Sequence, residues 1–515
     1  MVRNAVGREI PQRVPGRRLR PFMGAWASPP EPKKMRIAQH IVHSGPGADK
    51  LLGSLEKAID LVGLKDGMTI SFHHHLRNGD HVILQVLDAI AAKGIKNLRM
   101  GHSSMFPIHE PIVEHIKSGV VTRIEGNLNG PVGHYVSKHP LTTPVVIRSH
   151  GGRTRALECG ELEIDVAFLA ASASDGQGNC NGVLGRGMFG PMGFAIADSW
   201  YARKVVIITD NIVDYPCTPI SIPEHRVDYV VQVDKIGDPE GIASGTTEIT
   251  TDPARLKLAS DVIDMMEAAG LIKEGLMFQA GAGGTTLAVV KYLHERMKDR
   301  GLTGHFAVGG ITGLVVEMLH EGTVRKILDA QAFDIPAINS LREDPNHVEI
   351  SHYHFGNPHS KGCVTHMLDT CFMGATEVDV DFNVNVNTHS DGILLHGTGG
   401  HADAAAGSRV TFIITPIVRK RVPILRDAVT TVTTPGDTVD IVVTDHGVAV
   451  NPRRREIIEK LRSGGVKLCT IEALRDAAYG MTGKPDQLHW GRKIVGIIEY
   501  RDGTVTDVVR QVEEG

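Results

Sequence analysis

Short apolar runs alternate with helical patterns along most of the chain after residue 50. The run Met68–Phe72 suits a buried strand, a helical pattern over Val82–Ala92 ends before Gly94, and Asn97–Met100 predicts the next strand. Further strand-like runs occur at 121–124, 145–148, 164–169, 205–209 and 229–233. Helix and strand signals that alternate in this way predict an α/β fold built on an open parallel sheet with helices on both faces.

The same order of segments returns about 200 residues later in the chain. Gly63–Phe72 is echoed by Gly270–Gln279, and Val113–Ile124 is echoed by Val316–Ile327. Two later strands, Lys204–Thr209 and Asp228–Val231, are also repeated, as Val410–Thr415 and Asp440–Val443. We therefore expect a tandem duplication of one α/β/α domain, with a first copy at 46–248, a second at 249–515 and a ligand-binding cleft between them.

Composition narrows the class of protein. The chain has 515 residues, 42% hydrophobic and 22% charged, which is typical of a globular protein with more than one core. Its net charge of −4 hides a basic start, since residues 1–36 hold nine Arg and Lys against two Glu. The acidic remainder argues against a nucleic-acid surface, and no apolar run is long enough to span a membrane.

The basic segment at 1–45 is rich in proline and lacks the apolar stretch of a secretory signal. We expect a flexible N-terminal arm, with an Arg-rich transit peptide as the alternative. The six cysteines form no CxxC pair and have no zinc-binding spacing. They predict reduced thiols and a cytoplasmic protein.

Two glycine-rich loops in the second copy are the candidate binding elements. The first follows the strand at 276–279 and contains Gly281, Gly283 and Gly284 before a helical pattern begins. Glycines at such a position let backbone N–H groups approach a phosphate, carboxylate or oxyanion. The second loop has the same character, with these candidate substrate-binding residues: Gly397, Thr398, Gly399, Gly400 and His401.

Histidines are frequent, 26 in all, and His73, His74 and His75 close the first predicted strand. His73 and His75 would share one face of a strand, but no helical His pair with a third ligand is evident, so we expect no metal site. Polar strand ends at a cleft explain these histidines equally well.

Several ordered runs resemble the citrate lyase alpha-subunit family of the coenzyme A transferase superfamily. The resemblance extends from about residue 50 to the end of the chain. The runs are Asp66–His75, Val113–Ile124, Ser149–Gly152, Gly160–Leu169, Phe306–Thr312, Pro345–Ser351, Phe382–Val386, Ser390–Gly392, Val443–Pro452 and Tyr500–Gly503.

This resemblance implies a transferase of the coenzyme A-transferase type. Acetyl-carrier and citrate would give citryl-carrier and acetate, where the carrier is the phosphopantetheine-type thiol of an acyl carrier protein or coenzyme A. The implied partners are the beta (citryl lyase) and gamma (acyl carrier protein) subunits of citrate lyase, in an oligomer, with no cofactor bound by this chain. A short-chain acyl-coenzyme A transferase or hydrolase with another acceptor, a non-catalytic scaffold subunit and a sugar-phosphate isomerase are the alternatives.

One departure from the superfamily bears on mechanism. Many of its members carry a nucleophilic Glu after a strand of the second domain, and Gly313 occupies the corresponding position here. The catalytic residues therefore stay unassigned, and we expect a ternary complex in which citrate itself attacks the thioester. Citrate has three carboxylates, so its pocket should contain arginine or lysine. The candidates are Arg77, Arg148, Arg153 and Arg186.

Overall fold

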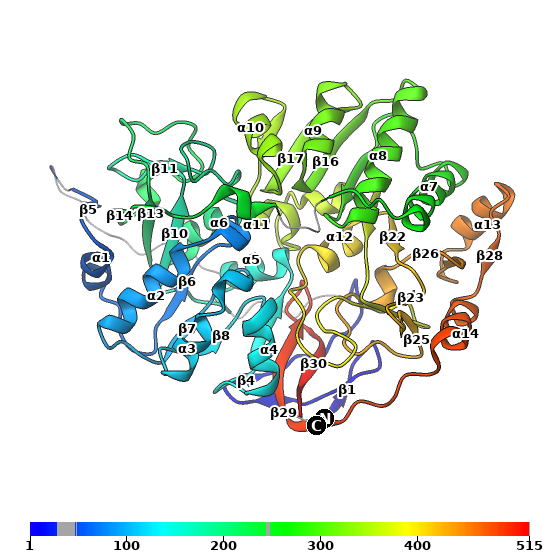
Figure 1. Ribbon diagram of the computed structural model, residues 1–515, viewed down its shortest axis with the longest axis horizontal. Helices are drawn as coiled ribbons and strands as arrows, with labels where there is room; N and C mark the ends of the chain where they lie inside the picture. Colours follow the sequence, from blue (N-terminus) through cyan, green and yellow to red (C-terminus); the bar gives the residue numbers. More distant parts are fainter. Residues whose placement is uncertain (28–46, 48, 244–247, 514–515) are drawn as a thin grey trace.

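The computed structural model describes residues 1–27, 47, 49–243 and 248–513, and two large sheets form its framework (Figure 1). The first is a seven-stranded parallel sheet. Its strands, in spatial order, are β5 (Leu51–Leu52), β14 (Tyr229–Gln232), β13 (Lys204–Thr209), β10 (Val166–Ala171), β6 (Thr69–Ser71), β7 (Leu98–Met100) and β8 (Val121–Ile124).

The second sheet has nine strands and is parallel except where β26 meets β27. In spatial order they are β18 (His347–Glu349), β17 (Val324–Ala332), β16 (Gly304–Ile311), β15 (Met277–Ala280), β19 (Thr370–Met373), β22 (Val410–Ile414), β26 (Ile441–Thr444), β27 (Gly447–Val450) and β28 (Leu468–Cys469).

The strand order confirms the duplicated fold. The first sheet contains β8-β7-β6-β10-β13-β14 and the second contains β17-β16-β15-β19-β22-β26 in the same order. The repeated segments pair four of these strands, β6 with β15, β8 with β17, β13 with β22 and β14 with β26. Each copy therefore places the strand of the first repeated segment, β6 or β15, in the interior of its sheet. The carboxyl ends of β6 and β15 carry the histidine run and the first glycine loop, respectively.

Helices cover both sheets and follow the apolar pattern of the sequence. In α2, predicted and observed at Val82–Ala92, Val82, Ile83, Val86, Leu87 and Ile90 are buried. The other helices of the first half are α1 (Leu55–Leu61), α3 (Ile112–Lys117), α4 (Gly130–Lys138), α5 (His150–Glu158) and α6 (Gly193–Tyr201). Those of the second are α7 (Pro253–Ala268), α8 (Gly284–Asp299), α9 (Gly313–His320), α10 (Ile335–Glu343), α11 (His352–Gly356), α12 (His401–Gly407), α13 (Arg455–Ser463) and α14 (Ile471–Thr482).

Among these helices and the rest of the described chain, none combines the length and apolar composition needed to cross a membrane.

A third, three-stranded sheet joins the C-terminal hairpin to the first half of the chain. The C-terminal hairpin of β29 (Trp490–Glu499) and β30 (Val505–Val512) pairs through β29 with β9 (Val145–Arg148) of the first half. The strand predicted at 145–148 is thus present, but in this small sheet and not in the large one.

The N-terminal residues pack against this third sheet. Ile10 and Leu19 form a buried cluster with Val146, Ile497 and Val505. Two short hairpins are built from β1 (Val2–Arg3), β2 (Glu9–Ile10), β3 (Arg13–Val14) and β4 (Arg17–Arg18). A flexible arm was expected over 1–45, and for residues 1–27 that expectation is wrong, because burial of apolar side chains holds them in place. Residues 28–46 lie outside the described residues.

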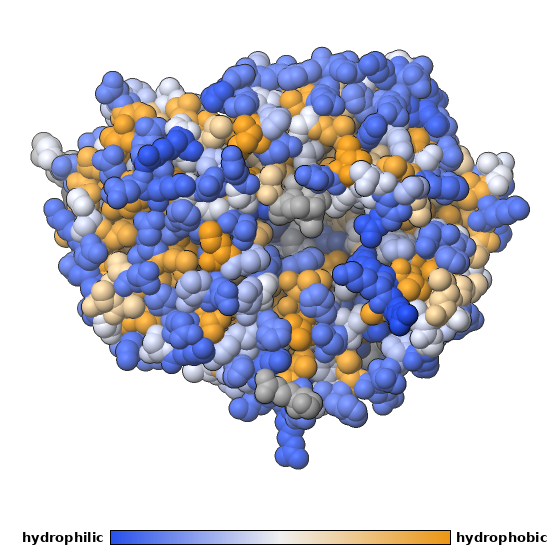
Figure 2. Space-filling model, viewed as in Figure 1, coloured by the Kyte–Doolittle hydropathy of each residue, from blue (hydrophilic) through white to orange (hydrophobic). Residues whose placement is uncertain are grey.

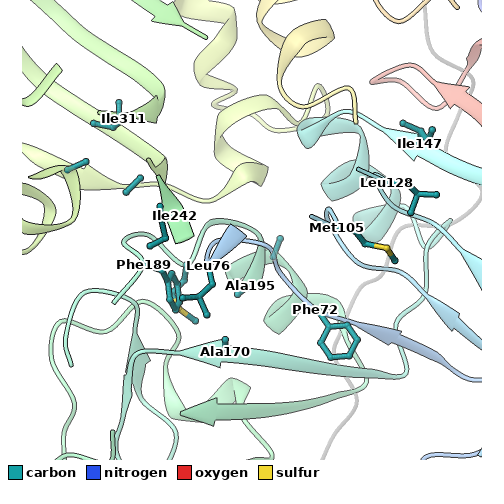
Figure 3. Close-up of a cluster of buried hydrophobic side chains, with 14 of the residues drawn as sticks. Phe72, Leu76, Met105, Leu128, Ile147, Ala170, Phe189, Ala195, Ile242 and Ile311 are labelled. Carbon is teal, nitrogen blue, oxygen red and sulfur yellow. The ribbon is translucent and has the colours of Figure 1, made fainter. Parts of the chain in front are cut away.

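The hydrophobic core is continuous between the halves. One cluster contains Phe72, Leu76 and Phe189 of the first half together with Ile311 and Ile338 of the second. Figure 3 shows Phe189 and Leu76 close to Ile242, with Ile311 farther along the same cluster. The halves therefore pack through apolar side chains as well as through polar contacts, which fixes the geometry of the surface between them.

Candidate functional site

The carboxyl ends of several parallel strands meet where the two halves of the chain pack together. The first half contributes His73–His75 after β6, and the second contributes Gly281 after β15, Thr312 after β16 and Phe333 after β17. Open parallel sheets bind ligands at this edge. The surface is hollowed near the middle of the view in Figure 2, where Figure 1 shows the two halves meeting.

The first glycine loop connects β15 to α8 and keeps its backbone close to neighbouring strands. The Gly281 N–H donates to the Phe372 carbonyl at 2.9 Å, and the Thr286 hydroxyl donates to the Gly281 carbonyl at 2.6 Å. A Cβ on Gly284 would lie 2.8 Å from the Glu248 carbonyl oxygen, so only glycine fits there without displacement. Gly283 is the N-cap of α8, and the positive end of this 16-residue helix faces the loop.

The second glycine loop lies between the halves. The Gly399 carbonyl accepts a hydrogen bond from the His150 N–H at 2.9 Å, and Gly399 has a left-handed φ of 59°. A Cβ on Gly397 would lie 2.1 Å from Cγ of Asn127, so the loop backbone packs directly on this first-half side chain. Thr398 is buried beside Asn387. The loop therefore touches groups from both halves.

Both loops are anchored to β19 or to the residue that follows it. The Gly281 N–H bonds Phe372 in that strand, and Nε2 of His401 bonds the carbonyl of Gly374 just after it at 3.0 Å. The other ring nitrogen of His401 bonds the Thr434 hydroxyl at 2.7 Å. His401 thus has both ring nitrogens engaged and acts as an anchor of the second loop.

A cluster of aromatic and imidazole rings forms a wall of the site where the two halves meet. Phe194 stacks on His352 with ring centroids 3.7 Å apart and planes 5° apart. The His150 ring stands at 86° to His352 and at 88° to Phe194. His74 bonds the Ser103 hydroxyl at 2.6 Å and Gln331 of the second half at 3.1 Å. Side chains of both halves thus interlock around His150.

These imidazoles are neutral at ordinary pH. Burial lowers the pKa of His74, His75 and His352 well below the usual value, and neighbouring histidines add to the effect. Burial and the charge of Arg153 also lower the pKa of His150. A neutral imidazole can donate or accept a hydrogen bond without adding charge, which suits contacts to carboxylates and thioester oxygens.

The four candidate arginines have different environments in the structure. Arg148 pairs with Glu499 at 2.7 Å, and Arg153 pairs with Asp198 at 2.7 Å, so buried carboxylates balance both charges. The Arg186 side chain is 67% exposed, 3.5 Å from Asp210. These three arginines support the fold or lie at the surface.

Arg77 lies at the boundary between the halves. Its guanidinium carbon is 4.5 Å from the ring centroid of Phe333 in the second half and 5.4 Å from that of Phe106 in the first. The side chain is buried, burial lowers its pKa to about 10, and its φ is 53°. A cationic side chain held between two rings on left-handed backbone is typical of a binding site.

Gly313 begins α9, and its N–H donates to the Asp334 carboxylate at 2.7 Å. A Cβ there would lie 3.1 Å from Pro336. Carboxylates near this edge are bound to backbone N–H groups. Asp334 also caps α10 at Ala337, and Glu349 accepts from the Met192 N–H at 2.5 Å.

The second loop thus contacts His150, whose ring lies beside that of His74, and Arg77 lies between Phe106 and Phe333. Sequence reasoning did not single out His150 or Phe194, which depend on contacts between the halves. For His150 the signal was the run Ser149–Gly152, quoted for the family resemblance. Within the described residues no group of three or more His, Cys, Asp or Glu is arranged to hold a metal ion.

Comparison with known proteins gives one family. Residues 48–512 match the family described as citrate lyase, alpha subunit. The citrate lyase alpha chains of Haemophilus influenzae and Escherichia coli are each 46% identical over 466 residues, covering 90% of this chain and 93% and 91% of theirs.

Solved structures agree with this result. The alpha subunit of citrate lyase from Streptococcus mutans, in complex with citrate, has a TM-score of 0.95 and 46% identity, covering 99% of this chain and 100% of that one. A Pseudomonas malonate decarboxylase hetero-tetramer in complex with malonate has a TM-score of 0.59 at 15% identity, covering 84% of this chain and 88% of that chain. At that identity the likeness concerns the fold alone.

Proposed function

The chain belongs to the citrate lyase alpha-subunit family, and from this premise we propose that it transfers the acyl-carrier thiol from an acetyl thioester to citrate. The products are a citryl thioester and acetate. The reaction is of the coenzyme A-transferase type, and the thiol is the phosphopantetheine-type arm of an acyl carrier protein or coenzyme A.

One observation carries the proposal. Two glycine loops, neutral imidazoles and Arg77 converge on the strand edge between the halves, and the position of the superfamily nucleophile holds Gly313. Such a site can bind a polycarboxylate and an oxyanion. Residue 313 supplies no carboxylate from which a covalent acyl-enzyme could be formed, and the nearby Asp334 carboxylate accepts hydrogen bonds from the Gly313 and Ala337 N–H groups.

The reaction proceeds in two acyl-transfer steps without an enzyme nucleophile. A citrate carboxylate oxygen attacks the acetyl thioester carbonyl, the carbon–sulfur bond breaks, and a mixed citric–acetic anhydride and a thiolate form. The thiolate then attacks the citryl carbonyl of the anhydride, and the carbon–oxygen bond to acetate breaks. No atom is left on the protein.

The protein's contributions follow from the site. Holding citrate and thioester in attack geometry can supply about 7–11 kcal/mol of the barrier. Each tetrahedral oxyanion needs donors, and one well-placed backbone N–H contributes about 10²–10³ in rate. The Gly281 N–H is already bonded to Phe372, so the N–H groups at 283–284 and 397–400 suit this role, with Arg77 and His150 placed to bind citrate carboxylates. A beta (citryl lyase) and a gamma (acyl carrier protein) subunit are the partners that the family membership supports.

An acceptor assay tests the function. Purified chain is given acetyl-coenzyme A with citrate, acetate, butyrate or water, and the products are separated by mass. Citryl-coenzyme A formation from citrate alone is expected. Comparable turnover with butyrate or water would instead identify a general acyl-coenzyme A transferase or hydrolase.

A trapping experiment tests the route. Hydroxylamine is added during turnover with ¹⁴C-acetyl-coenzyme A, and the protein is digested and analysed. We expect label in small hydroxamates and no hydroxamate on the chain. A hydroxamate on the side chain of Asp334 or Glu349, detected by peptide mass because the acetyl label leaves as acetate, would establish a covalent acyl-enzyme and overturn the ternary-complex route.

A further inference from the structure

A β-hairpin beside the site carries three consecutive basic residues. Arg419 ends β23 (Val418–Arg419), and Lys420 and Arg421 form the two-residue turn that leads to β24 (Val422–Pro423). The two strands pair antiparallel. Lys420 and Arg421 are exposed, at φ of 47° and 68°. A hairpin turn with positive φ at both central residues favours Asn and Gly. Lys420 and Arg421 therefore occupy a backbone conformation that is unfavourable for their residue types.

The charge of this turn is not balanced by acidic side chains. In the parts of the chain that the structure describes, no carboxylate forms an ion pair with Arg419, Lys420 or Arg421. Burial and then the neighbouring charge of Arg255 lower the pKa of Arg419. Arg255, which lies 3.6 Å from Asp252, is thus a fourth cation near the turn. The like charges repel one another unless an anion is bound between them.

The turn is connected directly to the glycine loops. Nη2 of Arg419 donates to the Ala375 carbonyl at 3.2 Å. Ala375 follows Gly374, whose carbonyl bonds His401 of the second loop, and Phe372 in the same segment bonds Gly281 of the first. Strongly hydrophilic surface lies beside the central hollow in Figure 2, where Figure 1 places β23.

We infer that this basic turn, together with Arg255, binds the phosphate at the far end of the thioester-bearing arm. The inference rests on the proposed function, which places the thioester at the glycine loops. A phosphopantetheine arm separates its thiol from its phosphate by a flexible chain. When the thioester is at the glycine loops, the phosphate therefore lies at a distance from them and needs a site of its own. A guanidinium group can donate two parallel hydrogen bonds to a phosphate.

The test removes the charge of the turn and varies the phosphate on the donor. The double variant K420Q/R421Q, which leaves the hydrogen bond from Arg419 to Ala375 in place, is assayed with acetyl-pantetheine, acetyl-4′-phosphopantetheine and acetyl-coenzyme A. The KM of phosphate-bearing donors is expected to rise roughly tenfold or more, because hydrogen bonds to charged groups are lost. The KM of acetyl-pantetheine and that of citrate should not change.

The two possible phosphate sources give different results, each of which supports the site. A rise for both phosphorylated donors identifies the arm phosphate, and a rise for acetyl-coenzyme A alone identifies the nucleotide phosphates. An equal rise for acetyl-pantetheine, or no rise for any donor, would overturn the inference.

The matched control is R325Q/K326Q, which removes two adjacent exposed basic residues at the beginning of β17. They lie at the amino end of this strand, whereas the candidate site lies at the carboxyl ends of the strands. It should leave every KM unchanged. Calorimetric titration of coenzyme A into wild type and variant measures the phosphate site without turnover. Failure of the proposed transfer reaction is thus distinguishable from failure of the phosphate site.

Discussion

The carboxylate of Asp403 in the second half accepts a hydrogen bond from the backbone N–H of Gly151 in the first half at 2.8 Å. Its other oxygen accepts from the Ser149 hydroxyl at 2.9 Å and lies 3.5 Å from Nε of Arg501 in the C-terminal hairpin. Asp403 thus binds the first turn of α5, which begins at His150. The position of His150 in the site therefore depends on the contact between the two halves.

Asp403→Asn should lower kcat about 100-fold, because a displacement of about 1 Å in a group near the reaction costs about that factor. The matched control is Asp440→Asn. Asp440 is buried, accepts from the Thr411 N–H at 2.8 Å and pairs with Arg454, within the second half. Both variants should lose about 1–3 kcal/mol of stability, measured by urea unfolding, but only the first should lose kcat. Equal kcat for the two variants would mean that Asp403 is purely structural.

Gly399→Val should abolish transfer and leave the fold intact. The φ of 59° disfavours a β-branched residue by about 1–2 kcal/mol, and relief of that strain would move the carbonyl that His150 binds. Gly465→Val is the control, since Gly465 has φ 81° with open space around it. Transfer assays and circular dichroism of both variants check this. Retained activity in the Gly399 variant would remove the loop from the mechanism.

Arg77→Gln should raise the KM for citrate about 10- to 100-fold, since loss of a charged hydrogen bond costs about 1.5–3 kcal/mol. The KM for the acetyl donor should stay the same. Arg186→Gln removes an exposed arginine of the same half and should change neither constant. Steady-state kinetics with each substrate varied in turn makes the measurement. An unchanged citrate KM in the Arg77 variant would place the citrate carboxylates elsewhere.

Acid should destabilise the protein partly through His102. This side chain is fully buried, and burial lowers its pKa to about 3 from the ordinary 6.5. Between these values the unfolded chain binds the proton and the folded chain does not. The free energy of unfolding therefore falls as pH drops below about 6.5, by up to about 1.4 kcal/mol per pH unit for this group.

His102→Asn should remove the contribution of one bound proton from the pH dependence of the unfolding free energy, which is about 1.4 kcal/mol per pH unit. Urea unfolding at a series of pH values from 4 to 7 on wild type and variant gives the two slopes. The variant's lower absolute stability does not enter the comparison, because only the pH dependence is tested. Identical slopes would show that His102 is protonated in the folded protein.

Much of the fold could be predicted because it follows from local composition. Strand-forming runs such as Val121–Ile124 and the amphipathic pattern of Val82–Ala92 specify their own conformation, and the structure has both at the predicted bounds. Leu51–Leu52, in contrast, continues the apolar pattern of the helix that follows it but is not part of that helix. It forms an edge strand paired with Val230–Val231, because α1 starts only after the Ser54 cap.

The glycine loops were also predicted from the sequence, since a run of glycines after a strand-forming segment indicates a loop without any information about distant residues. The role of His401 was not, because its two hydrogen-bond partners, Gly374 and Thr434, come from other segments. The four arginines were equivalent in the sequence. Their separation required knowing that Glu499 and Asp198 are folded against Arg148 and Arg153.

The sequence by itself determined the duplicated parallel α/β architecture, the family and the two glycine loops. Hydrophobic periodicity and the conformational freedom of glycine act over a few neighbouring residues, so their effects can be predicted from the order of residues along the chain. Only the tertiary structure decided that β9 leaves the large sheet, that residues 1–27 are folded, and that Asp403 reaches Gly151 across 252 residues. Such contacts depend on how two completed halves dock, and burial of their shared apolar surface leaves no periodic trace in the sequence.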